Sequence, residues 1–545
     1  MSNMRDITVP RNVFLVLATL VGVWLIWDSV VYRLVTYSMW ADYWEHSGAL
    51  TEWLRNTLNP GNPHVSDDSS SARYIPLYYL LVLIGSPLGL DALDLMALSA
   101  VINYLLVVVG IWLFCSVYFR NPWAPAVAFV VLFCGWGVPW IWSNLYELRS
   151  FFMTASYPST FVFGLSLISF WLTLSFMRGM TGFFSGLALL LLLSALGFVS
   201  HALTGVFLVG ATCLLAVTEQ DAPPSLRVMV IIAACSGPLL AALWPFFPVW
   251  DVILASSAEV DDRTWQVFSG FDAMLERARS GAWWHMFFDP AQFITSLGPA
   301  LLGIPLALWL LLRWRELFIP LGLLMMTGPL ILNVFFQVAL AHRFLLYAVF
   351  FMHLAIVWGI LELFDRWRIQ RRENKRTPGV TITVGVVRVL VALAVIGHVA
   401  LLIGDYNGNH LKYTLELIDK RHALPAGYDT PQLYTELTEE LPQDAVVIGN
   451  SRLTWPLSTF RGKAVALPEN HENSLLRDQF ERVDAVNLWL APATSAEDRA
   501  RIAALYDATH ALVNLQTTDV AVLQWLSDNA IPLTTVERYR MYRLN

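Results

Sequence analysis

The chain has 545 residues, of which 56% are hydrophobic and 14% are charged, and its formal net charge is −7. A soluble globular protein carries roughly 25% charged residues, so this composition excludes an ordinary soluble enzyme. Apolar runs of about 20 residues, long enough to cross a hydrocarbon core of about 30 Å, recur along the chain and predict a polytopic α-helical membrane protein.

Apolar segments follow one another over residues 1–403, which we interpret as a transmembrane domain of about 11–13 helices. They lie near residues 12–36, 74–90, 93–118, 123–143, 157–177, 183–199, 202–218, 226–248, 293–312, 317–341, 344–364 and 379–403. The segment 74–90 is the weakest, because Gly85, Pro87 and Gly89 interrupt it. We expect it to be half-inserted or non-spanning.

Residues 404–545 have ordinary polar content, and their alternating strand and helix patterns predict a C-terminal soluble α/β domain. The stretches expected to be strands are 445–448, 464–467, 485–490 and 511–515. Ser495 comes before a helical pattern and is followed three residues later by Asp498, which predicts the N-cap of a helix.

Lysine and arginine placement predicts the orientation in the membrane. The strongest basic cluster, between Arg366 and Arg376, marks a cytoplasmic loop. Counting apolar segments from this loop places three parts of the chain on the outer side. They are a first outer loop at 37–73, a second outer loop at 249–290, and the C-terminal domain.

The acidic cluster Asp42-Tyr43-Trp44-Glu45-His46 directly follows the first apolar segment. Residues 40–58 have helical spacing, with tryptophan and leucine on one side and polar groups on the other, which is typical of a helix lying in the membrane interface. A carboxylate in this place is suited to accept a proton from a hydroxyl nucleophile. Asp42 is therefore the candidate base and Glu45 the nearby alternative, while the plainer interpretation makes both acids part of a solvated helix face.

Two short stretches in this layout carry a family resemblance. They are Asp42-Tyr-Trp-Glu45 in the first outer loop and Tyr74-Ile-Pro-Leu-Tyr-Tyr79 after it, followed by many helices and an outer α/β domain. The whole layout resembles the GT-C superfamily of integral membrane glycosyltransferases. The second stretch is similar to the helix entry of its dolichyl-phosphate-mannose and aminoarabinose transferase relatives, with one proline replaced.

The resemblance implies a GT-C-like fold, a polyprenyl-phosphate-linked sugar donor and Asp42 as the catalytic base. It also implies a bacterial inner membrane as the location, with the C-terminal domain in the periplasm. The expected partners are the lipid-linked donor, a glycan, lipid or protein acceptor, and membrane lipids.

The lipid phosphate that leaves in such a reaction needs positive charge, which arginine supplies best. Arg343 is the first candidate, because it follows His342 at the boundary of an apolar segment on the predicted outer side. Arg149 is the second candidate, and His201, between two apolar segments, could contact phosphate or sugar. Each has a plainer interpretation: Arg343 as an arginine at a helix boundary, Arg149 as the ion-pair partner of Glu147, and His201 as a packing histidine.

Candidate contacts to the sugar or the acceptor lie in the two outer loops or directly after the first: Trp44, Tyr74, Asp261, Asp262, Trp284 and His285. The pair Asp261-Asp262 lacks a third ligand within sequence reach, so we expect no fixed metal site and leave Mg²⁺ or Mn²⁺ open as a cofactor. No nucleotide-binding or nucleic-acid-binding motif is present, which agrees with a lipid-linked donor.

The sequence therefore favours an inverting glycosyltransferase. A polysaccharide polymerase or ligase is the alternative enzyme, and a transporter or a scaffold protein is the alternative outside enzymes. A transporter would show mid-membrane acids, broken helices or an internal repeat, of which the sequence shows only the interrupted segment at 74–90.

Overall fold

The computed structural model describes residues 2–34, 42–137, 146–250, 290–335, 343–372, 397–398, 400, 431–468, 476 and 478–545. They form two compact units. The first comprises Met1–Leu25, Val101–Ala241 and Glu259–Tyr413, and the second comprises Ile26–Ala100, Ala242–Ala258 and Thr414–Asn545. The predicted first outer loop thus belongs to the same unit as the C-terminal residues. The expected boundary at 404 lies outside the described residues.

The first unit is helical. Its helices, two of which (α1 and α4) run on in sequence into the second unit, are α1 (Ser2–Leu34), α4 (Ala92–Phe119), α5 (Ala124–Cys134), α6 (Leu148–Thr154), α7 (Pro158–Met177), α8 (Phe183–Ser200), α9 (Ala202–Thr218), α10 (Pro224–Ala241), α15 (Pro290–Leu297), η2 (Gly298–Leu302), α16 (Gly303–Leu312), α17 (Phe318–Phe335) and α18 (Phe344–Arg372).

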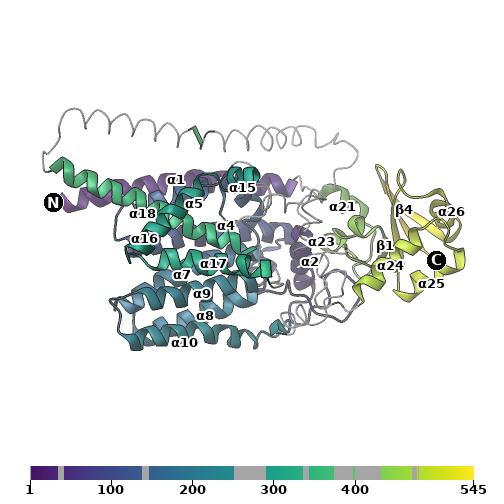
Figure 1. Cartoon of the computed structure of the whole chain (residues 1–545). Coiled ribbons are helices and arrows are strands. Elements are labelled where there is room, and N and C mark those ends of the chain that lie inside the picture. Colours follow the sequence, from purple (N-terminus) through teal and green to yellow (C-terminus); the bar gives the residue numbers. More distant parts are fainter. Residues whose placement is uncertain are drawn as a thin grey trace. The chain divides into compact units, whose positions relative to one another are not determined.

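Helices α7 to α10 lie side by side with nearly aligned axes (Figure 1). Small residues permit the close approach: a Cβ added at Gly237 of α10 would lie 2.3 Å from the Cβ of Ser194 on α8. Between α7 and α9, the hydroxyls of Ser169 and Thr212 share a hydrogen bond of 3.1 Å. Small residues and interhelical hydroxyl bonds are the usual means by which helices associate in lipid, where burial of apolar surface gives little drive.

Within the part of the chain that the structure describes, seven helices are long and apolar enough to cross a membrane: Thr8–Trp27, Ala92–Phe119, Pro158–Met177, Phe183–Ser200, Pro224–Ala241, Phe293–Leu312 and Phe344–Arg366. Four shorter apolar helices are Pro76–Leu88, Ala124–Cys134, Ala202–Thr218 and Phe318–Leu332. These coincide with every predicted apolar segment except 379–403, most of which lies outside the described residues. The prediction of a polytopic α-helical membrane protein is confirmed.

The doubtful segment 74–90 forms α3 (Pro76–Gly85), which a short 3₁₀ turn, η1 (Ser86–Leu88), continues. At 1.5 Å per residue the two together reach about 20 Å, less than a hydrocarbon core of about 30 Å. This length is too short for a full crossing, and the half-inserted placement stays a prediction.

The second unit contains α2 (Asp42–Arg55), α3, η1 and an α/β region. The elements of this region are α21 (Pro431–Leu437), β1 (Val446–Gly449), α22 (Ser451–Thr454), α23 (Leu457–Phe460), β2 (Lys463–Ala464), α24 (Gln479–Leu490), α25 (Ala496–Leu505), β3 (His510–Asn514), α26 (Val520–Asn529), β4 (Ala530–Val536) and β5 (Tyr539–Leu544). The expected α/β fold of the tail is confirmed.

The five strands form one mixed sheet in the order β2-β1-β3-β5-β4. Strand β1 pairs in parallel with β2 and β3, and β5 pairs antiparallel with β3 and β4. Alternate residues of β1 enter two different cores: Val446 and Ile448 join the cluster around Trp489, whereas Val447 joins the cluster around Tyr434. Strand β1 is therefore covered on both faces, which explains its continuous apolar run.

Local predictions for the tail succeed in part. The strands expected at 445–448 and 511–515 are β1 and β3, but only Lys463–Ala464 of the region around 464–467 is a strand. The Ser495 hydroxyl accepts a hydrogen bond of 3.0 Å from the amide of Asp498, so the predicted N-cap is confirmed.

The strand expected at 485–490 is wrong, because these residues end helix α24. Val483, Val486 and Trp489 are buried at a spacing of three, which is helical, and a short apolar run cannot by itself distinguish a strand from a buried helix. The hairpin β4–β5 was not predicted, because its threonines and arginines interrupt any clear apolar pattern.

The central strand gives a direct test of this core. Ile448 is fully buried, so Ile448→Ala should cost about 2–5 kcal/mol of stability through lost contacts and a cavity. We would follow thermal unfolding of the purified full chain. The matched control is Ile531→Ala on β4, which is 43% exposed and should cost much less. Equal losses in the two variants would contradict the placement of β1.

Candidate active site

Helix α2 presents two carboxylates in its first turn, where acids are favoured by the positive end of the helix dipole. Asp42 is exposed, whereas Glu45, one turn further on, is fully buried. The Arg73 guanidinium donates to Glu45 Oε2 from Nε at 2.8 Å, and its Nη2 contacts the same oxygen. Glu45 is thus engaged in an ion pair, whereas Asp42 lies exposed at the start of the helix.

The remaining turns of α2 are bound to the C-terminal part of the same unit. The Ser47 hydroxyl shares a hydrogen bond of 2.7 Å with the Thr459 hydroxyl. Thr51 donates to the Thr459 carbonyl and Arg55 donates to the Phe460 carbonyl, each at 2.8 Å. We call this contact of α2 with α23 the loop–tail interface. It fixes the helix that carries Asp42.

The segment after α2 extends the interface to the sheet. The amide of Ala464 donates to the carbonyl of His64 at 2.7 Å, and Val65 forms a parallel bridge with Ala464. His64 Nδ1 lies 2.9 Å from the Ser458 hydroxyl. A Cβ added at Gly48 would lie 2.5 Å from that hydroxyl and 2.6 Å from His64 Cε1, so the close approach of α2 depends on glycine at this position.

His64 is buried among charged neighbours. Its burial lowers the pKa of the imidazole to about 4, an effect that the Glu45 carboxylate opposes and that Arg73 and Lys463 reinforce. The ring is therefore neutral in the folded protein at ordinary pH.

Trp44 and Tyr74, predicted to contact sugar or acceptor, are both buried. Trp44 packs against the rings of Tyr434 and Phe460. The Tyr74 hydroxyl donates to the Gly61 carbonyl at 2.5 Å, and its backbone carbonyl accepts from Trp244 Nε1 at 2.6 Å. Both rings support the loop from within, and a direct role in binding stays a prediction.

In the first unit, His201 and Arg343 lie at the starts of two neighbouring helices. His201 caps α9: its Nδ1 accepts from the amide of Thr204 at 3.2 Å and lies 2.8 Å from that residue's hydroxyl. The same hydroxyl bonds the Tyr347 hydroxyl of α18 at 2.7 Å. Arg343 is exposed and comes one helical turn before Tyr347.

This arrangement concentrates positive potential. Two helix N-termini, each carrying the positive end of a dipole, are joined through the Thr204–Tyr347 bond. The ring of Phe207 stacks on Tyr347 at 4.4 Å and stiffens the junction. Arg343 adds a full charge beside it. An anion such as a phosphate is the ligand that this chemistry favours.

The other candidates are less informative. Arg149 lies in α6, but its side chain is outside the described part of the structure, and Glu147 accepts from the amide and hydroxyl of Ser150, each at 2.8 Å. The candidates for which nothing is described are His342, Asp261, Asp262, Trp284 and His285. Within the described residues, no group of three or more His, Cys, Asp or Glu side chains could hold a metal ion.

Sequence reasoning missed the partners of the predicted residues. Arg73 is the basic residue that ends the polar segment after the acidic cluster, and this complementary charge was the available signal. The roles of His64 and Thr204 had no such signal, because their partners Ser458 and Tyr347 are distant in sequence.

No family model matches the chain, and no curated protein does. Among solved structures, ArnT from Cupriavidus metallidurans bound to undecaprenyl phosphate superimposes with a TM-score of 0.52 at 15% identity, covering 97% of both chains. The apo oligosaccharyltransferase of Archaeoglobus fulgidus gives a TM-score of 0.52 at 13% identity, covering 98% of this chain and 74% of that one. The chain has the GT-C fold.

Apo ArnT also matches, with a TM-score of 0.50 at 14% identity over 97% of both chains. The GT-C resemblance read from the sequence is thereby confirmed as a fold. Identity at this level shows the fold alone, and residue roles rest on the geometry described above.

The neutral state of His64 makes the loop–tail interface sensitive to acid. Its pKa is about 4 when folded and about 6.5 when unfolded, so between these values the unfolded chain binds a proton that the folded chain does not. The His64 contribution, about 3 kcal/mol, is complete above pH 6.5 and is lost as the pH falls toward 4.

We would measure thermal unfolding of wild type and His64→Gln near pH 7 and pH 5. Glutamine cannot titrate, so the variant should be less stable at neutral pH but should lose less on acidification. His510, whose pKa burial also lowers, is present in both proteins and cancels in the comparison. An identical acid-induced loss in both proteins would remove His64 from this role.

Proposed function

We propose that the chain is an inverting glycosyltransferase that moves a sugar from a polyprenyl phosphate to an acceptor hydroxyl. The proposal is supported by the GT-C fold and by the contrast between the two acids of α2. Glu45 is neutralised by Arg73 inside the protein, whereas Asp42 stands exposed at the helix start. An accessible carboxylate held on a fixed helix is what a general base requires.

The donor class is argued from charge. The junction of α9 and α18 gathers two helix N-termini and Arg343, which suits the phosphate of a lipid-linked sugar. ArnT, which shares the fold, has been crystallised with undecaprenyl phosphate. We extend that ligand class to this chain as part of the proposal.

In the proposed reaction, Asp42 accepts the proton of the acceptor hydroxyl as its oxygen forms a bond to the anomeric carbon. The bond between that carbon and the phosphate oxygen breaks, and the lipid phosphate leaves with its charge stabilised by Arg343. Attack opposite the leaving group inverts the anomeric configuration. We place the reaction on the periplasmic face of a bacterial inner membrane, with a glycan, lipid or protein as acceptor.

The base is tested with Asp42→Asn in purified full-length protein. The variant should release free polyprenyl phosphate from a panel of polyprenyl-phosphate sugars, with acceptors supplied, about 10²–10⁴-fold more slowly than wild type. Asp528→Asn, at another exposed acid, is the control and should retain full activity. Full activity in Asp42→Asn would transfer the role of base to another acid, and no release by wild type from any donor would favour a ligase or a transporter.

The phosphate site is tested with Arg343→Gln, which should lower the rate of lipid phosphate release roughly 10²–10³-fold by removing charge from the leaving group. Arg343→Lys should restore part of this loss, since it keeps the charge without the planar geometry. Arg313→Gln, at an exposed arginine after α16, is the control. Similar rates for Arg343→Gln and wild type would show that the leaving group is stabilised elsewhere.

A further inference from the structure

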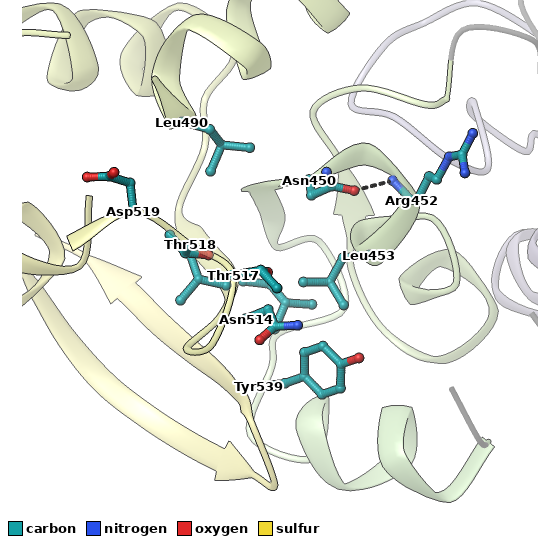
Figure 2. Close-up of a pocket in the computed structure, with 11 residues that line it drawn as sticks. Asn450, Arg452, Leu453, Leu490, Asn514, Thr517, Thr518, Asp519 and Tyr539 are labelled. Carbon is teal, nitrogen blue, oxygen red and sulfur yellow. Dashed lines mark hydrogen bonds between the residues drawn. The ribbon is translucent and has the colours of Figure 1, made fainter. Parts of the chain in front are cut away.

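A pocket of about 430 Å³ opens in the α/β region, at the carboxyl ends of β1 and β3 (Figure 2). Its volume falls within the range of about 300–1,000 Å³ that is usual for small-molecule sites. All of its lining residues belong to the second unit. None of them was among the candidate site residues of the sequence, and the proposed transfer reaction does not use them.

The strand order explains why a pocket forms here. Strand β1 lies between β2 and β3 and pairs in parallel with both. The chain leaves β1 toward β2 on one side, and β3 lies on the other side. In α/β sheets such a reversal leaves a crevice outside the carboxyl ends of the strands, and ligands bind in that crevice.

The loop that closes the pocket is held rigidly. The side-chain oxygen of Asn514 accepts from the amide of Gln516 at 2.9 Å. The backbone carbonyl of Asn514 accepts from the amides of Thr517 and Thr518 at 3.2 and 2.9 Å. Asp519 caps α26 by accepting from the amide of Ala521 at 2.8 Å. The backbone groups of the loop are largely satisfied internally, so a ligand would meet a preorganised surface.

Several polar side-chain groups at the pocket remain available. Within the described residues, the amide nitrogens of Asn450 and Asn514 and the hydroxyls of Thr517 and Thr518 have no hydrogen-bond partner. Tyr539 pairs with Asn514 across β3 and β5 and brings an aromatic ring beside these groups. Amides, hydroxyls and one ring are complementary to a ligand with several hydroxyls and an apolar face.

The charges indicate which ligand class is favoured. Asn514, Thr517 and Tyr539 gather together, whereas Arg452 and Asp519 lie on opposite sides with their charged ends turned away (Figure 2). Among the lining residues, one positive and one negative group at the margin offset each other. Arg538 does not line the pocket; it lies over the Tyr539 ring at 5.0 Å and donates to the Tyr539 hydroxyl at 2.7 Å. The uncharged centre matches a neutral ligand.

We propose that this pocket binds a neutral sugar residue. Asn450 and Asn514 would donate to its hydroxyls, Thr517 and Thr518 would bond others, and the Tyr539 ring would contact its apolar face. Sugar binding here needs no turnover and does not depend on the proposed transfer reaction. If both are right, the α/β region holds part of a glycan away from the reacting hydroxyl.

The test is saturation-transfer difference NMR on the purified full chain with neutral hexoses and pentoses, and with glycerol and inorganic phosphate as comparators. We expect at least one sugar to receive saturation at millimolar concentration. The signal should fall several-fold in Thr517→Val and in Asn514→Asp, which remove a hydroxyl and an amide donor. Thr534→Val, on β4, is the matched control and should leave the signal unchanged.

Asp42→Asn separates this site from the proposed reaction, because it should abolish turnover and keep the sugar signal. A signal that survives both pocket variants would place sugar binding elsewhere and overturn the proposal. So would the absence of any sugar signal, equal saturation of glycerol, or displacement of the sugar by phosphate in proportion to its concentration.

Discussion

The loop–tail interface is the contact on which the candidate site depends. Helix α2 is short and only weakly apolar, and an isolated helix of 14 residues is marginal in water. It is stabilised by hydrogen bonds from Ser47, Thr51 and Arg55 to residues more than 400 positions later. The orientation of Asp42 is therefore a property of the whole second unit and not of the loop alone.

The two acids of α2 differ in their surroundings: Glu45 is buried in an ion pair and Asp42 is exposed. Glu45 and Arg73 neutralise each other inside, and the neutral imidazole of His64 lies between them and the tail. A buried carboxylate without such a partner would be costly, so the pair permits α2 to pack tightly on both sides. Asp42 is the exposed acid at the start of α2.

Much of the fold could be predicted from the sequence, because membrane helices can be identified by their length and hydropathy. The segments around α7 and α8 are almost entirely apolar, and their bounds agree with the predicted ones within one residue. The tail was harder: the run 485–490 is a helix because Trp489 and Val486 face one core, which no local pattern reveals. Asp42 could be singled out by its position after the first apolar segment. The contacts of its helix could not be predicted, since Arg73 and Thr459 reach α2 only through tertiary folding.

The sequence separation within the loop–tail interface also determines when its two sides can meet during synthesis of the chain. The hydroxyls of Ser47 and Thr459 bond across 412 positions, so α2 leaves the ribosome long before its partners exist. Until α23 has been synthesised, the helix that carries Asp42 lacks the groups that hold it. A nascent or truncated chain that ends before α23 thus carries the acid without these contacts, and α2 gains them only once Thr459 and Phe460 have been synthesised.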